Sequence, residues 1–122
     1  MNPSIVSETY TPDRLIAGDF PLVTQEVTLI SGQNLARGAL LGKITASGKY
    51  NLSLAAAGDG SQTPVAILAE AVDASGGDKQ CPIYESGEFN QDALTIGTGH
   101  TAASVRAGLR ALGIHLKAPV KP

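Results

Sequence analysis

The stretch PVAILAEAV, residues 64–72, is the most continuous apolar run in the chain. A strand that is apolar on both faces usually lies in the middle of a fold, because neither face can be left in water. We therefore expect these residues to form a central strand. Glu70 interrupts the run, and its carboxylate suits a sheet edge or a contact between subunits. A catalytic role for it would need a histidine, a nucleophile or a metal partner, which the sequence does not offer.

Further strands are expected on both sides of this run. Apolar and polar residues alternate from Val23 to Leu29, and they alternate again around the turn ASGK at 46–49, which predicts a β-hairpin. Another strand is expected at 81–89, with a bulge or bend at Gly87. Turn signals recur about every 8–12 residues, so the sequence predicts a mainly β domain.

One helix is expected, close to the C-terminus. Apolar residues recur with helical spacing from Ala102 to Leu112. Either Thr98 or Thr101 can cap the N-terminus of this helix, and Gly113 suits the turn at its end. The residues after Gly113 are expected to form a polar tail.

Composition limits the classes of function. The chain has 122 residues, room for one domain, and aromatic residues make up only 4% of it, with no Trp. A core of small aliphatic side chains buries little area per residue and gains from a neighbouring subunit, which favours an oligomer. The net charge is −2 and no basic patch is present, so direct binding to nucleic acid is not expected.

The expected location follows from further features of the sequence. No apolar run approaches the roughly 20 residues of a membrane span, and the first residues do not have the pattern of a secretory signal. The single cysteine, Cys81, has no partner for an internal disulfide or at zinc-binding spacing. We expect a protein made in a reducing cytoplasm, without a membrane partner.

The segment Gly97-x-Gly99-x-x-Ala102 has the spacing of a dinucleotide-binding turn. A dinucleotide fold needs a second parallel strand and an acidic residue after the helix. Only IHLKAPVKP, residues 114–122, remains after it, and this stretch contains neither Asp nor Glu. The glycines are therefore interpreted as a tight turn between a strand and the helix.

No other group of residues supports catalysis or metal binding. His100 and His115 flank the helix without a cysteine or carboxylate at metal-ligand spacing. Glu85 and Glu88 could form an acid/base pair as in glycoside hydrolysis, although a solvated strand edge explains them better. Cys81 has no adjacent base and is interpreted as a small buried side chain. We expect no catalytic residue, cofactor, metal or small-molecule substrate.

Residues 1–22 differ from the rest of the chain. Pro3, Pro12 and Pro21 interrupt any helix, and the apolar residues between them follow no period. Two interpretations stay open for this segment. It is either an arm that orders when it meets a surface or a first strand along the edge of the domain.

Five stretches, in sequence order, resemble the head decoration proteins of lambda-like tailed bacteriophages. They are YTPDRLIAGDFPLV (10–23), VTLISGQNLARGALLGKI (27–44), SQTPVAILAEAVDA (61–74), YESGEFNQDAL (84–94) and LRALGIHLK (109–117). Each stretch alone is a weak signal. Together their order and spacing cover most of residues 10–117.

The resemblance implies a β-clip-like single domain with an extended N-terminal arm, residues 1–22, and one C-terminal helix. Residues 23–122 would form the trimerising domain. The homotrimer would sit on the outer surface of the expanded head at three-fold and quasi-three-fold positions and bind the major capsid protein. It would stabilise the shell against the pressure of packaged DNA. The capsid-binding residues expected in the arm are Tyr10, Pro12, Leu15, Ile16, Phe20 and Pro21.

Two alternatives to a capsid decoration protein stay open. One is a small trimeric nucleotide-binding or hydrolysing enzyme on a similar fold, although the sequence lacks a carboxylate-plus-basic phosphate site. The other is a different trimeric virion component, such as a head fibre base or a tail part.

Overall fold

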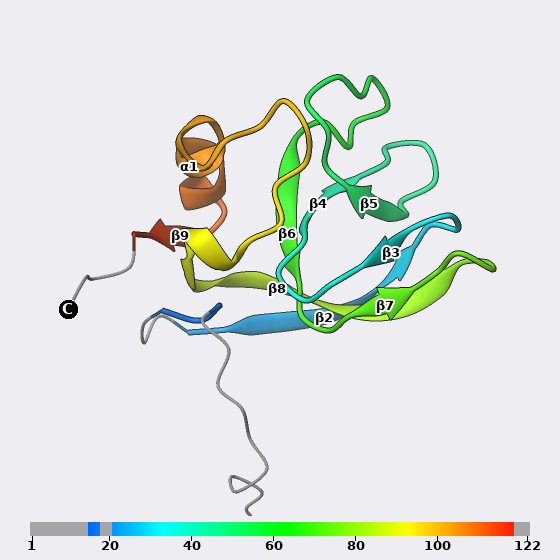
Figure 1. Cartoon of the computed structure of the whole chain (residues 1–122), viewed down its shortest axis with the longest axis horizontal. Helices are drawn as coiled ribbons and strands as arrows, with labels where there is room; N and C mark the ends of the chain where they lie inside the picture. Colours follow the sequence, from blue (N-terminus) through cyan, green and yellow to red (C-terminus); the bar gives the residue numbers. More distant parts are fainter. Residues whose placement is uncertain (1–14, 18–20, 119–122) are drawn as a thin grey trace, which may run out of the picture.

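Five strands of one sheet close into a small barrel, and a single α-helix packs beside it (Figure 1). The computed structural model describes residues 15–17 and 21–118. Within them the strands are β2 (Val23–Leu29), β3 (Asn34–Leu35), β4 (Leu40–Lys43), β5 (Tyr50–Leu52), β6 (Pro64–Leu68), β7 (Val72–Asp73), β8 (Lys79–Asn90) and β9 (Ile114–Lys117). The helices are the 3-10 turn η2 (Gln91–Ala93) and α1 (Ala102–Ala111).

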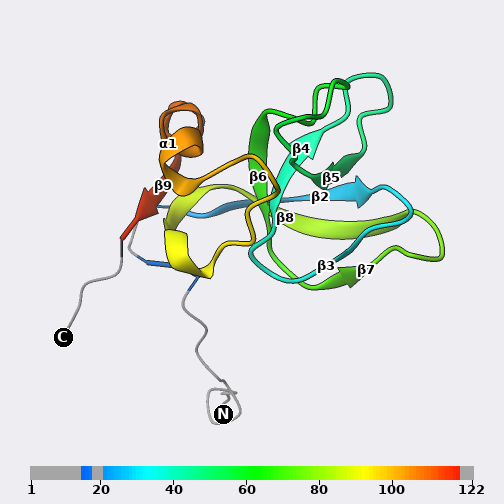
Figure 2. The same ribbon diagram turned by 45° about the horizontal axis from the view of Figure 1, so that its top comes forward.

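The strand order of the sheet is β2-β5-β4-β6-β8-β9, and a second pairing between β2 and β8 closes the first five strands into a ring. Of these pairings only β2–β5 and β8–β9 are parallel. β3 and β7 form a separate two-stranded ribbon, visible beside the barrel in Figure 2. The predicted mainly β, β-clip-like domain with one C-terminal helix is therefore confirmed.

β6 is buried on both faces, as its sequence predicts. Ala66 and Leu68 belong to an apolar cluster inside the barrel, together with residues of β2, β4, β5 and β8. Ile67, between them, belongs to a second cluster that lies between the barrel and α1. Neighbouring residues of β4 and β8 divide between the two clusters in the same way. The strands β4, β6 and β8 thus form a wall with one core on each side.

The predicted strand at 64–72 is two strands rather than one. β6 ends, the chain bends at Ala69 and Glu70, and β7 then pairs with β3. The Arg37 guanidinium holds this bend, because it donates to the Ala69 carbonyl at 2.8 Å and to the Tyr84 hydroxyl at 2.9 Å. Apolar patterning could not reveal the break, since Arg37 is distant in the sequence. Glu70 is exposed at the bend.

The predicted hairpin and helix are both present. β4 and β5 pair in antiparallel register, with Lys43 opposite Tyr50. Thr101 is the N-cap of α1: its hydroxyl accepts the Ser104 N–H at 3.0 Å, and the Ser104 hydroxyl accepts the Thr101 N–H at 2.9 Å. This reciprocal pair satisfies two backbone donors that a helix start leaves unbonded. Gly113 follows the helix with a φ of 92°.

The predicted polar tail after Gly113 contains a strand instead. β9 runs parallel to the end of β8, with Ile114 opposite Gly87. Ile114 and Leu116 are buried against the second cluster. A parallel strand therefore does follow the helix, contrary to expectation. It forms because the alternate residues Ile114 and Leu116 both pack into the cluster between α1 and the barrel. It contains no acidic residue.

Gly42 lets the loop at 59–61 pack directly against β4. A β-carbon on Gly42 would lie 1.9 Å from the Ser61 carbonyl oxygen. That carbonyl accepts a hydrogen bond from the Ser53 hydroxyl at 2.7 Å. The Asp59 carboxylate accepts from the Ser61 hydroxyl at 2.6 Å and from its backbone N–H at 3.0 Å, and these bonds hold the pKa of Asp59 below its ordinary value.

Replacement of Gly42 by alanine is expected to destabilise the fold, because the bonded Ser61 backbone would have to move. We expect Gly42→Ala to lower the free energy of unfolding by about 1–3 kcal/mol or more, as measured by urea denaturation. Gly76→Ala is the matched control, since a β-carbon there would meet nothing within 4 Å. The control should change the free energy by less than about 0.5 kcal/mol. Equal stabilities of the two variants would contradict the close approach.

Candidate functional site

Residues 15–17 attach the N-terminal segment to the end of β8. The Asn90 N–H donates to the Leu15 carbonyl at 2.6 Å. The Ala17 N–H donates to the Glu88 carbonyl at 2.9 Å. β9 pairs with the same stretch of β8, so the end of β8 lies between two short segments from opposite ends of the chain. Figure 1 shows residues 15–17 in dark blue beside this end of the sheet.

The Leu15 side chain is part of the core of its own domain. It is 2% exposed and belongs to the cluster between the barrel and α1, with Leu40, Phe89 and Leu109. Full burial of a leucine side chain stabilises a fold by about 1.5–3 kcal/mol. Leu15 was expected to contact a capsid. In this position its side chain anchors residues 15–17 to the domain.

Ile16 and Pro21 are the expected capsid-binding residues that lie on the surface. Ile16 is 37% exposed and lies opposite Phe89 in an antiparallel bridge. Pro21 is exposed, and its carbonyl accepts a hydrogen bond from the Ser86 hydroxyl at 2.9 Å. The remaining expected residues, Tyr10, Pro12 and Phe20, lie outside the described residues.

Gly87 marks the place where β8 exchanges one partner for another. Before it β8 pairs with β2, and from Gly87 onward it pairs with β9. Its φ of 144° lies in the region that favours glycine. A β-carbon there would lie 2.5 Å from Leu22 Cδ2 and 2.8 Å from Phe89 Cζ. The Leu22 and Phe89 side chains thus cover the bend expected at Gly87.

Ser53 and His100 form a serine–histidine contact that the sequence did not reveal. His100 Nε2 lies 3.1 Å from Ser53 Oγ. The Ser53 hydroxyl donates its single proton to the Ser61 carbonyl at 2.7 Å, so His100 Nε2 is the donor in this contact. Ser53 is also fully buried. The pair therefore ties the loop before α1 to the barrel, and it lacks the arrangement of an activated nucleophile.

A groove of about 310 Å³ lies between α1 and residues 62–64. Its lining includes no Lys, Arg, Asp or Glu side chain. The nearby Gly97 and Gly99 serve close packing: β-carbons on them would lie 2.0 Å from the Ser53 carbonyl oxygen and 2.6 Å from Ala55 Cβ. These two close contacts explain why glycines stand at positions 97 and 99, the spacing that resembles a dinucleotide-binding turn.

Glu85 and Glu88 have separate partners on the two sides of the Gly87 bend. The Gln25 amide on β2 faces the Glu85 carboxylate. Lys117 Nζ on β9 lies 3.4 Å from Glu88 Oε2. Each carboxylate therefore has a partner on a different neighbouring strand. This agrees with the interpretation of Glu85 and Glu88 as residues of a strand edge and not as an acid/base pair.

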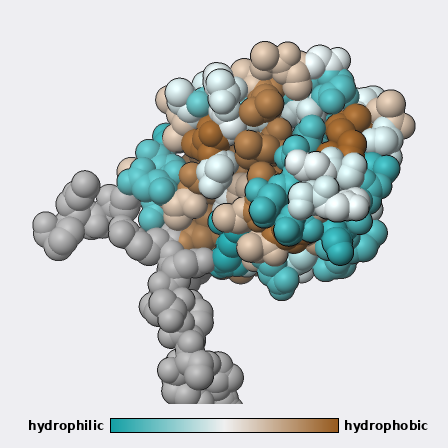
Figure 3. Space-filling view, turned by 45° about the vertical axis from the view of Figure 1, so that its right-hand side comes forward, coloured by the Kyte–Doolittle hydropathy of each residue, from teal (hydrophilic) through white to brown (hydrophobic). Residues whose placement is uncertain are grey.

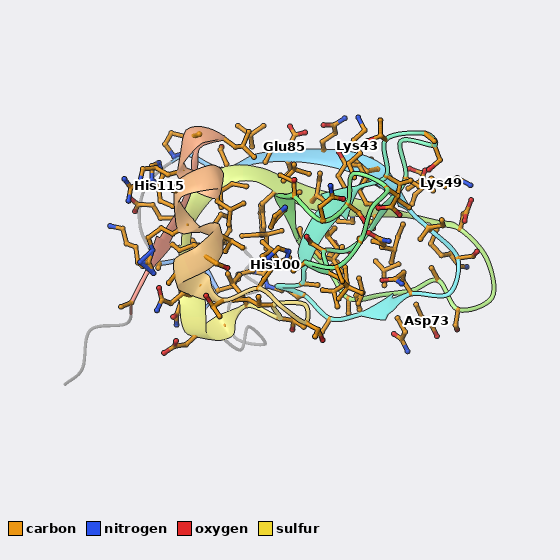
Figure 4. All side chains as sticks on the ribbon, turned by 90° about the horizontal axis from the view of Figure 1, so that it is seen from above. Lys43, Lys49, Asp73, Glu85, His100 and His115 are labelled. Carbon is orange, nitrogen blue, oxygen red and sulfur yellow. The ribbon has the colours of Figure 1, made fainter. Side chains whose placement is uncertain are left out.

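The two histidines lie in different parts of the domain, His100 near its middle and His115 at the β9 end (Figure 4). In the described ranges, no three His, Cys, Asp or Glu side chains gather into a group that could hold a metal ion. No helix in residues 15–17 and 21–118 is long and apolar enough to cross a membrane.

Comparison with known protein families agrees with the resemblance seen in the sequence. Residues 5–116 match the family model described as bacteriophage lambda head decoration protein D. The chain belongs to this family. Comparison with the curated proteins gives no match. Membership makes the chain a phage head decoration protein, a structural component associated with the capsid of the virion and not a member of an enzyme family.

The decoration protein also has surface residues that sequence reasoning missed. Leu22, Val23 and Leu112 are large apolar side chains that remain between two fifths and one half exposed. Val23 and Leu112 were assigned to apolar faces because their spacing fits the strand and the helix. Val23 is the first residue of β2 and Leu112 is the residue that follows the end of α1, so periodicity no longer implies burial at either position.

Two weakly acidic groups of the decoration protein are shielded from water. Burial raises the pKa of Tyr50, and the charge of Glu85 raises it further. Burial also raises the pKa of the Cys81 thiol, with a contribution from Glu26. Cys81 lies in the cluster inside the barrel, so the prediction of a small buried side chain is confirmed.

The different positions of Leu15 and Ile16 give a test of the attachment. We expect Leu15→Ala to lower the free energy of unfolding by about 2–5 kcal/mol, since it leaves a cavity in the core. Ile16→Ala should change it by less than about 1 kcal/mol, because this side chain is partly in water. Urea denaturation of both full-length variants measures the difference. Equal effects would show that residue 15 is not anchored as described.

The raised pKa values predict how stability depends on pH. An unfolded chain releases the Cys81 proton near the ordinary pKa of 9.0, whereas the folded chain holds it to higher pH. The free energy of unfolding should therefore be constant near neutral pH and fall as pH rises above about 9. Cys81→Val should show a smaller fall than the wild type between about pH 8 and 10. Identical pH profiles would contradict the shielding of the thiol.

Proposed function

We propose that the protein decorates the expanded phage head as a homotrimer at three-fold and quasi-three-fold positions and stabilises the shell against internal DNA pressure. The partner is the major capsid protein, and the site of synthesis is the host bacterial cytoplasm. The observation that carries the proposal is family membership over residues 5–116. The proposed role of the N-terminal segment as a capsid-binding arm rests on the same family membership.

The attachment of residues 15–17 supports a capsid-binding role for the N-terminal segment. A segment that links the domain to a shell must be held firmly by the domain, and Leu15 is held by its buried side chain and by the hydrogen bond that its carbonyl accepts from the Asn90 N–H. The arm was expected to comprise residues 1–22. We propose that residues 1–14 of this arm bind the capsid, and that residues 15–17 attach the arm to the end of β8.

Binding energetics favour a trimer over a single chain. Fixing the backbone of each arm residue costs about 1–2 kcal/mol, which offsets much of the gain from its contacts. Three arms held in one trimer bind together, and such linkage raises avidity by roughly 10²–10⁴. A ligand that binds only the expanded shell stabilises that shell by mass action. The arms can add strands to exposed sheet edges of the capsid.

Co-sedimentation with expanded heads that lack the protein tests the proposal. We expect the full chain to pellet at about three copies per three-fold position, and a chain that begins at Leu15 to stay in solution. Unfolding of the shortened chain should match the full chain, because the anchoring residue is retained. Light scattering of the free protein should give the mass of a trimer.

Other outcomes would change the proposal in distinct ways. Equal binding of both chains would retain decoration but remove the role of residues 1–14. No binding of the full chain would contradict decoration of the expanded head. A copy number in virions far below that of the major capsid protein would favour a fibre base or a tail part.

A further inference from the structure

The loop between β5 and β6 contains the one place in the chain where an Asp or Asn residue is followed by glycine. Asp59 precedes Gly60, whereas none of the other Asp or Asn residues has a glycine after it. Glycine has no side chain to shield its backbone nitrogen. The Asp59–Gly60 bond is therefore the aspartyl bond of this chain that is most open to attack by the backbone on the side chain.

The reaction at such a bond is a cyclisation that needs no other reactant. The Gly60 nitrogen attacks Cγ of the protonated Asp59 carboxyl group, a C–N bond forms, and the carboxyl hydroxyl leaves with the amide proton as water. Water then opens the cyclic imide. When it adds to the main-chain carbonyl of Asp59, the product is isoaspartate, in which the chain runs through the former side-chain carboxyl carbon.

The fold needs both residues of this dipeptide. Gly60 has a φ of 103°, in the region that favours glycine, and a β-carbon there would collide with Thr45 Oγ1. The Asp59 carbonyl accepts the Thr45 N–H at 2.9 Å. The Asp59 carboxylate holds Ser61, the residue that packs against Gly42. A reactive pair of residues is thus imposed by the packing of the loop.

Water has access to this loop. Asp59 is exposed, and its loop projects at the top of Figure 1, next to the turn between β4 and β5. Figure 3 shows hydrophilic residues interleaved with hydrophobic ones on a face of the domain, as is usual for a surface in contact with water. Exclusion of water therefore does not protect the Asp59–Gly60 bond.

Hydrogen bonds engage both reacting groups instead. The bonds that the Asp59 carboxylate accepts from the Ser61 hydroxyl and N–H favour its ionised form and hold its pKa below the ordinary value. An ionised carboxylate has no hydroxyl to lose. The Gly60 N–H donates to Gln62 Oε1 at 2.8 Å, so the proton that must leave the attacking nitrogen is held by a side chain.

A second aspartate in the same molecule provides a matched comparison. The Asp73 carboxylate accepts the Ser75 hydroxyl at 2.5 Å and the Ser75 N–H at 3.0 Å, as Asp59 does with Ser61. The next residue is Ala74, and its N–H donates to the Gln33 main-chain carbonyl at 2.7 Å. The acceptor at this second site belongs to the backbone. At Gly60 it is a single side chain.

We infer that Asp59–Gly60 is a site of spontaneous backbone isomerisation in this protein, and that Gln62 suppresses the reaction by holding the Gly60 N–H. Isomerisation inserts a methylene group into the main chain next to Ser61. The Ser61 carbonyl has no spare room against Gly42 and accepts the Ser53 hydroxyl. The isomerised chain is therefore less stable. The inference does not depend on capsid binding.

Full-length variants test the protection. Gln62→Met removes the accepting oxygen and keeps the length of the side chain, and Thr63→Ala is the control at the next position, which is exposed. Folded samples are incubated at neutral pH, and peptide mapping with mass spectrometry measures isoaspartate at residues 59 and 73. The wild type is also incubated unfolded in urea. Thermal midpoints are measured for every sample.

We expect Gln62→Met to isomerise at residue 59 about 2- to 10-fold faster than the wild type, the effect of one lost hydrogen bond on a rate. The rate at residue 73 should not change, and Thr63→Ala should behave as the wild type does. In urea the wild type should react faster at residue 59 than it does when folded. Its isomerised fraction should have a lower thermal midpoint after refolding.

Other results would overturn the inference. Equal rates at residue 59 in Gln62→Met and the wild type would remove the protecting role of Gln62. An equal acceleration at residues 59 and 73 in this variant would do the same, because it would indicate general unfolding. A rate at residue 59 no higher than at residue 73 in urea would contradict the site itself.

Discussion

Burial of both faces of β4, β6 and β8 is the constraint on which the rest of the structure depends. Successive residues of a strand point to opposite faces, so an uninterrupted apolar strand needs a core on each side. Closure of the barrel buries one face, with Ala66 and Leu68 inside it. The other face, with Ile67, stays in water unless other elements cover it.

That second core is assembled from parts of the chain that are distant in sequence. α1 contributes Val105 and Leu109, β9 contributes Ile114 and Leu116, and the N-terminal side contributes Leu15. A residue from the beginning of the chain and two elements from its end therefore share one cluster. The anchorage of the N-terminal segment is a consequence of the same burial that holds the helix on the barrel.

This arrangement brings residues 15–17 and β9 together at one end of the domain. The end of β8 pairs with residues 15–17 on one side and with β9 on the other. Gly87 makes the change of partner possible, and large apolar side chains border it. The Ser53–His100 contact and the groove beside α1 lie elsewhere and serve packing. A structural role explains the molecule more simply than any chemistry of its side chains.

The sequence by itself determined the fold class, the strand from Val23 to Leu29, the hairpin, the capped helix and the bend at Gly87, because each depends on local periodicity or on one backbone conformation. It also determined the family, through stretches spread along the chain. Only the tertiary structure decided the rest. The break after β6 depends on Arg37, and the strand at Ile114 depends on a parallel partner that is distant in sequence. The burial of Leu15 and the exposure of Leu112 depend on which segments meet at the end of β8, and a residue pattern does not carry that information.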